Sequence, residues 1–95
     1  MNIKALHPDS KSVSTAVLFK STEGNVISIQ LAANEQLKEH ITKMPALLLC
    51  ITGEFVFENE NGIKLTLMTG DYIHIEPNTK HWILATSTSS LLLFK

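Results

Sequence analysis

The segment Gly70–Trp82 reads GDYIHIEPNTKHW, and it decides the fold predicted for the whole chain. Within this segment Ile73 and Ile75 alternate with polar residues, so an extended chain would place both isoleucines on one side of the strand. Pro77 cannot donate a hydrogen bond to a sheet ladder, so the strand must end there. Asn78 enters the left-handed backbone region at low cost, which suits a tight reversal. The segment therefore predicts a strand, a turn and a second strand that begins near His81.

Short apolar runs separated by turn residues extend in both directions from this segment. Asn61-Gly62 is a strong hairpin signal because both residue types accept a positive φ. Ala46–Phe57 is the most apolar part of the chain and predicts two strands that meet at a bend near Gly53. The other predicted strands are Val13–Lys20, Val26–Leu31, Gln36–Ile41, Ile63–Leu67, Trp82–Ala85 and Leu91–Phe94. Many short strands at intervals of about 8 to 12 residues predict an all-β sandwich or small barrel.

The length of 95 residues fits one domain. Residues 1–12 are mostly polar and contain His7-Pro8, so we expect a loosely held arm or an edge strand, with no role for His7. Residues 13–95 then form the barrel.

Composition limits the classes of partner. The 8 basic residues are scattered among 9 acidic ones, so no basic stripe is available for phosphates and we expect no nucleic-acid partner. Only 18% of residues are charged, which would leave apolar surface in water on a small monomer. We therefore predict a homodimer, with Val13–Phe19 and Leu91–Phe94 as candidate edge or interface strands.

Cys50 is the single cysteine, so an internal disulfide is impossible, and a small buried hydrophobe is the expected role of its side chain. The first residues lack the apolar run of a signal peptide, and no stretch approaches the roughly 18 apolar residues of a membrane span. We expect a soluble cytoplasmic protein with no membrane partner.

Several groups of residues together resemble the small single-domain cupins. They are Leu37–His40, Gly53–Phe57, Gly70-Asp71, Pro77-Asn78 and His81, and the resemblance covers about residues 17–95. It implies a double-stranded β-helix, a jelly-roll-like barrel in which two antiparallel sheets fold face to face around a central pocket.

The cupin motifs also suggest where a metal centre would stand. They run G-x5-H-x-H-x3,4-E-x6-G and G-x5-P-x-G-x2-H-x3-N. Counted back from Gly53, the two histidine positions of the first hold His40 and Thr42, and its glutamate position holds Ala46. The histidine of the second falls on His81. The family's metal centre uses three histidines and a glutamate, so the resemblance implies a degenerate site that keeps His40 and His81.

The resemblance also implies the character of the pocket. If the place held by Ala46 faces inward, Leu48 and Cys50 share that face because side chains alternate along a strand. The expected ligand-binding residues of this largely apolar pocket are His40, Thr42, Leu48, Cys50 and His81.

Two classes of function follow, and both stay open at this point. The first is a small-molecule-binding cupin that acts as a sensor or binding module. The second is a metal-dependent isomerase or dioxygenase in which His40 and His81 hold Zn, Fe, Mn or Ni, with water or Cys50 filling the remaining positions. A third possibility is a barrel that only assembles with another protein.

Overall fold

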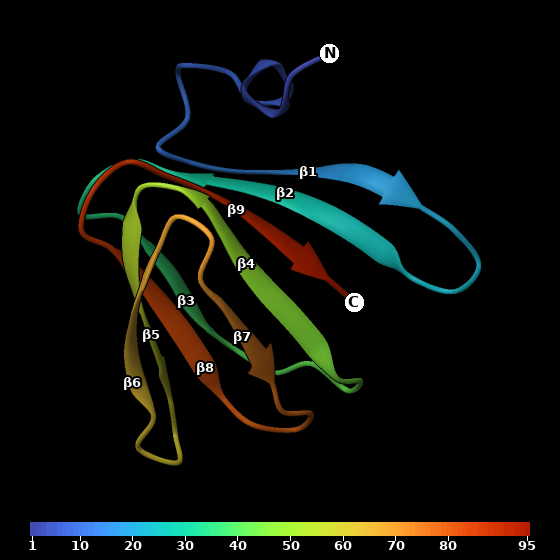
Figure 1. The fold of residues 1–95 in the computed structure, drawn as a ribbon, viewed down its shortest axis with the longest axis vertical. Coiled ribbons are helices and arrows are strands. Elements are labelled where there is room, and N and C mark those ends of the chain that lie inside the picture. Colours follow the sequence, from blue (N-terminus) through green and yellow to red (C-terminus); the bar gives the residue numbers. More distant parts are fainter.

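The computed structural model describes all residues, Met1–Lys95, and nearly all of its regular structure is β-strand (Figure 1). A four-residue 3-10 turn, η1, comes first and spans Ile3–Leu6. Nine strands follow: β1 Val13–Lys20, β2 Asn25–Leu31, β3 Gln36–His40, β4 Ala46–Thr52, β5 Glu54–Asn59, β6 Lys64–Met68, β7 Tyr72–Ile75, β8 His81–Ala85 and β9 Ser89–Phe94. No helix is long and apolar enough to cross a lipid bilayer.

The strands form two antiparallel sheets. One has five strands in the order β1-β2-β9-β4-β7, and the other has four in the order β3-β8-β5-β6. From β2 onward the chain passes repeatedly from one sheet to the other, as Figure 1 shows. This winding is that of a double-stranded β-helix, so the predicted fold class is confirmed.

The core lies between the sheets and contains 13 buried apolar residues. On β4, alternate residues face inward, and Ala46, Leu48 and Cys50 are all buried, as the period of two predicts. On β6 the burial does not follow this period, because Leu67 is buried whereas Leu65 on the same face is exposed.

The segment that decided the fold adopts the predicted conformation. Strand β7 ends at Ile75, Asn78 has a φ of 60°, and β8 begins at His81. The backbone N–H of Asn78 donates to the carbonyl of Thr42 at 2.7 Å. The corner is thereby tied to the loop that precedes β4.

Glycines mark two turns in the chain. Gly53, with a φ of 91°, separates β4 from β5, which confirms the predicted bend. Gly62 has a φ of 87°, but Asn61 does not adopt a positive φ, contrary to the prediction. Instead the Asn59 side chain accepts hydrogen bonds from the backbone N–H groups of Asn61 and Ile63, which builds a wider hairpin loop.

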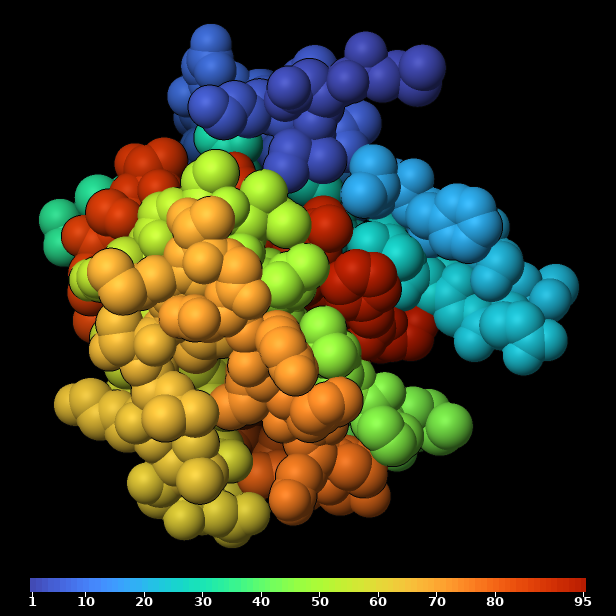
Figure 2. All heavy atoms as spheres, viewed as in Figure 1, coloured from blue at the N-terminus to red at the C-terminus, as the bar shows by residue number.

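The N-terminal segment contains the 3-10 turn η1 and no strand, and it is tied to the barrel through His7, for which no role was expected. The His7 side chain is buried, and its Nδ1 and Nε2 lie 2.7 Å from Ser14 Oγ and 2.8 Å from Ser28 Oγ. Burial lowers the pKa of His7. Figure 2 shows this segment, in dark blue, lying across one end of the barrel.

The hairpin of β1 and β2 extends beyond the rest of the barrel (Figure 1). Val17, Leu18 and Phe19 are consecutive and all exposed, so neither face of the strand is covered there. The other candidate, Leu91–Phe94, does not lie at a sheet edge. It belongs to β9, which pairs with β2 on one side and β4 on the other and buries Leu91 and Leu93.

Candidate functional site

Strands β3 and β8 bring His40 and His81 together. The two residues lie directly opposite each other in the antiparallel ladder. Their Nε2 atoms are 3.0 Å apart, and their rings meet edge to face with centroids 4.1 Å apart. Histidines that are distant in the sequence thus form one contact, which we call the His40–His81 pair.

Hydrogen bonds determine which ring nitrogen carries the proton in each histidine. His40 Nδ1 lies 3.2 Å from the Lys38 carbonyl oxygen, and His81 Nδ1 lies 3.2 Å from the Thr79 carbonyl oxygen. A carbonyl oxygen only accepts, so each Nδ1 is a donor and each Nε2 of a neutral ring offers a lone pair. Two unprotonated Nε2 atoms at 3.0 Å would repel each other, so the contact is favourable when one of them carries a proton.

The environments of the two rings differ. His81 is 1% exposed and stacks on the buried Phe57 ring, whereas His40 is exposed. Burial lowers the pKa of His81; the hydrogen bond to Thr79 works in the opposite direction, and the charge of His40 adds to the lowering. Burial therefore favours the neutral form of the His81 ring. Such a pair can hold a polar ligand atom or move one proton.

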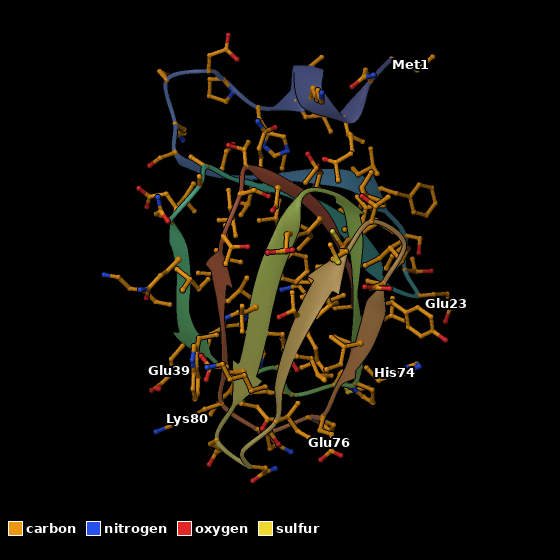
Figure 3. All side chains as sticks on the ribbon, turned by 60° about the vertical axis from the view of Figure 1, so that its left-hand side comes forward. Met1, Glu23, Glu39, His74, Glu76 and Lys80 are labelled. Atoms are coloured by element: carbon orange, nitrogen blue, oxygen red, sulfur yellow. The ribbon has the colours of Figure 1, made fainter.

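A surface hollow adjoins the pair. It has a volume of about 330 Å³, and we call it the His40 groove. Its lining residues come from the β3–β4 loop and from the adjoining ends of β2, β3 and β9: Asn25, His40, Ile41, Thr42, Lys43, Met44 and Lys95. In Figure 3, Glu39 and Lys80, the neighbours of the two histidines, lie side by side at this end of the barrel, where they form an ion pair at 3.8 Å.

The remaining predicted site residues are divided between the groove and the core. Thr42 lines the groove next to His40, and its Oγ1 is buried without a hydrogen-bond partner. Leu48 and Cys50 are packed in the core and line none of the four surface hollows. Burial, and secondarily the charge of Asp71, raises the pKa of the Cys50 thiol, so the prediction of a small buried hydrophobe is confirmed. Contact of Leu48 or Cys50 with a ligand stays a prediction.

The donor set does not fit a four-ligand metal centre. No group of three or more His, Cys, Asp or Glu side chains is placed to hold one metal ion. The positions that would complete the set carry Thr42 and Ala46, and the latter is a buried core residue. The His40–His81 pair supplies two nitrogen ligands and no carboxylate.

Five of the seven groove residues were not predicted as site residues, namely Asn25, Ile41, Lys43, Met44 and Lys95. Asn25 and Lys95 meet because β2 pairs with β9, and each donates its backbone N–H to the carbonyl of the other. Lys43 reaches the groove through the β3–β4 loop. No local pattern marks these residues, since their proximity depends on strand pairing.

Comparison with known proteins agrees with this architecture. A model of the cupin domain matches residues 28–94, which is more than half of the chain. The chain belongs to the cupin family. A search of curated protein sequences finds no match to this cupin.

Solved structures share the fold of this cupin at low sequence identity. A cupin superfamily protein from Desulfitobacterium hafniense DCB-2 is 18% identical with a TM-score of 0.86, and the match covers 98% of this chain and 84% of that one. An RmlC-like cupin from Methanocaldococcus jannaschii is 20% identical with a TM-score of 0.80, over 94% and 84% of the two chains. KdgF from Halomonas sp. is 16% identical with a TM-score of 0.78, over 93% and 83%. At such identities the likeness establishes the fold alone.

Proposed function

We propose that this cupin is a small-molecule-binding module whose site is centred on the His40–His81 pair and the His40 groove. The observation that carries the proposal is the approach of two Nε2 atoms to 3.0 Å beside a hollow of ligand size. A ligand in the groove would meet the exposed His40 ring first, with His81 behind it. In this proposal the protein is a cytoplasmic sensor or carrier with little catalysis of its own.

The short donor set supports binding over metal chemistry. Two imidazoles leave a divalent ion dependent on water for its remaining positions, which lowers affinity. The proposal therefore expects less than one tightly held transition metal per chain in the purified protein. Elemental analysis that finds one metal per chain would count against it.

Ligand binding is tested by a fragment screen followed by amide chemical shifts in 15N-labelled protein. We expect hits to shift the amides of His40 and Thr42, and the double variant His40→Ala/His81→Ala to lose them. His74→Ala is the matched control, because His74 is exposed on β7 and lines none of the hollows. Hits that bind the double variant as well as the wild type would contradict the proposal.

The second candidate is a metal-dependent isomerase or dioxygenase. It is favoured by the hydrogen bonds of both Nδ1 atoms to carbonyls, an arrangement that orients histidines toward metal ions. In this alternative His40 and His81 would hold Zn, Fe, Mn or Ni. If metal content and turnover survive the change His40→Ala/His81→Ala, the enzyme hypothesis fails.

We also propose a homodimer formed through β1. This strand is the edge of the five-stranded sheet, and Val17 and Phe19 are 58% and 59% exposed. An unpaired edge with apolar side chains on both faces is suited to pairing with the same strand of a second copy. Phe19→Glu should yield monomers in sedimentation velocity, whereas Leu65→Glu, exposed on the other sheet, should not. A wild-type monomer at micromolar concentration would overturn the proposal.

A further inference from the structure

We infer that the His40 groove recognises a small organic anion, a molecule with a carboxylate or phosphate group on an apolar body. This inference rests on the proposed function and adds the chemical class of the ligand. Four features of the groove lead to it: its charge, its unsatisfied polar groups, its fixed walls and its apolar rim.

The charged side chains that line the groove are all basic. Lys43 and Lys95 line it, and none of the 9 acidic residues of the chain does. The one ion pair in the structure joins Lys80 to Glu39, so both groove lysines are without a carboxylate partner. A concave surface with unpaired ammonium groups attracts anions and repels cations.

Two groove residues have polar atoms without partners. Thr42 Oγ1 and Asn25 Oδ1 are buried and make no hydrogen bond. The Thr42 hydroxyl can donate to an oxyanion, and the Asn25 amide can present its NH₂ group to one by turning about its last side-chain bond. Because a buried polar group without a partner is costly, a ligand oxygen that satisfies these groups would be stabilised by them.

Backbone hydrogen bonds hold both walls of the groove in place. Asn25 and Lys95 bond reciprocally, with N···O distances of 2.6 and 2.9 Å. The opposite wall is held by the 2.7 Å bond from Asn78 N–H to the Thr42 carbonyl. In Figure 2 the groove opens between the end of β9, in red, and the green residues of the β3–β4 loop. A preformed site loses less entropy on binding.

The rim and the volume of the groove indicate the character and size of the apolar part of the ligand. Ile41 and Met44 are 48% and 69% exposed and give the groove an apolar shoulder. A volume of about 330 Å³ is at the lower end of ligand pockets, so the body is about the size of one aromatic ring. Benzoate and phenyl phosphate match this description, and benzamide is the neutral counterpart of benzoate.

The experiment titrates 15N-labelled full-length protein with benzoate, phenyl phosphate and benzamide in low salt. We expect the two anions to shift the amides of Thr42 and Lys43, with benzamide at least tenfold weaker. The variant Lys43→Met/Lys95→Met keeps the apolar stems and should weaken anion binding at least tenfold. Lys64→Met is the matched control, since Lys64 is exposed on β6 outside the groove. The anion that binds more tightly shows whether the groove prefers a carboxylate or a phosphate group.

Each other outcome overturns a defined part of the reasoning. If benzamide binds at Thr42 as well as benzoate does, or if the lysine variant binds anions unchanged, the anion inference fails while the proposed binding function stands. If no probe shifts these amides but the fragment screen finds neutral or cationic ligands there, the anion inference again fails and the proposed binding function stands. If no fragment of any charge binds at His40 and Thr42, the proposed function itself fails.

Discussion

The anchoring of the N-terminal segment by His7 makes a quantitative prediction. His7→Ala removes two hydrogen bonds, of 2.7 and 2.8 Å, to Ser14 and Ser28. Each bond is worth about 1 kcal/mol net, and each buried hydroxyl left unpaired costs up to about 1 kcal/mol more. Ser14 and Ser28 are 6% and 1% exposed, so water cannot fully replace the imidazole. We expect the free energy of unfolding to fall by about 2 to 4 kcal/mol.

Urea denaturation measures this loss. With a slope of about 2 kcal/mol per molar, which is typical of a small domain, the midpoint should fall by roughly 1 to 2 M. Ser87→Ala is the control, because this hydroxyl is exposed and makes no side-chain hydrogen bond, and it should change stability by less than about 0.5 kcal/mol. A loss below about 0.5 kcal/mol for His7→Ala would refute the anchoring argument.

A double-mutant cycle separates the hydrogen bond from simple loss of packing. Ser28→Ala alone leaves His7 Nε2 without its partner, whereas His7→Ala/Ser28→Ala leaves neither group of that bond. The double variant should therefore lose about 1 to 2 kcal/mol less than the sum of the single losses. Additive losses would show that the bond itself contributes nothing.

The pH dependence has a definite sign. Burial lowers the pKa of His7, so the unfolded state binds the proton more readily than the folded state. The stabilising contribution is fully present above the ordinary pKa of about 6.5 and is lost as the pH falls through the folded-state value. Between pH 7.5 and 5 the wild type should lose more stability than His7→Ala. Parallel curves for the two proteins would contradict this reasoning.

The remaining predictions concern the bend, the thiol and the His40–His81 pair. Gly53→Ala should lower the free energy of unfolding by about 2 to 4 kcal/mol in urea denaturation, because φ is 91° and a Cβ would lie 2.5 Å from Ser89 Oγ. Gly62→Ala is the control, since Gly62 has a φ of 87° but lies in open space, and it should cost about 1 kcal/mol. Equal losses would contradict the packing argument. Cys50 is 0% exposed with a raised pKa, so a thiol reagent should modify it only as fast as the protein unfolds, and rapid labelling of folded protein would show the burial to be wrong. The lowered pKa of His81 should appear as a ring titration below pH 6.5 in NMR spectra, with the neutral form retained above it; a titration above 6.5 would contradict the burial argument.

Much of the fold could be predicted from the sequence because its signals are local. The bend at Gly53 and the corner at Asn78 follow from residue types that tolerate a positive φ, and both adopt one. The inward face of β4 follows from the period of two along a strand. The hairpin at Asn61-Gly62 shows the limit of such signals, since the Asn59 side chain, not the Asn61 backbone, shapes the loop.

The candidate site could be predicted in part. His40 and His81 were found by their spacing from turn glycines in the cupin motifs, and the ladder places them opposite each other. Lys43 and Lys95 could not be found in this way, because they meet in the groove through a loop and through the pairing of β2 with β9. The apolar residues of Leu91–Phe94 likewise fit an edge strand and a central strand equally well.

The sequence by itself determined where this chain is extended, where it turns and which side of most strands is apolar, because these properties depend on neighbouring residues and on allowed backbone angles. The tertiary structure alone decided which strands are neighbours, and with that the contact between two imidazoles, the burial of His7 and the charge of the groove. Strand pairing joins residues far apart in the chain, and no local pattern specifies which partner each strand will take.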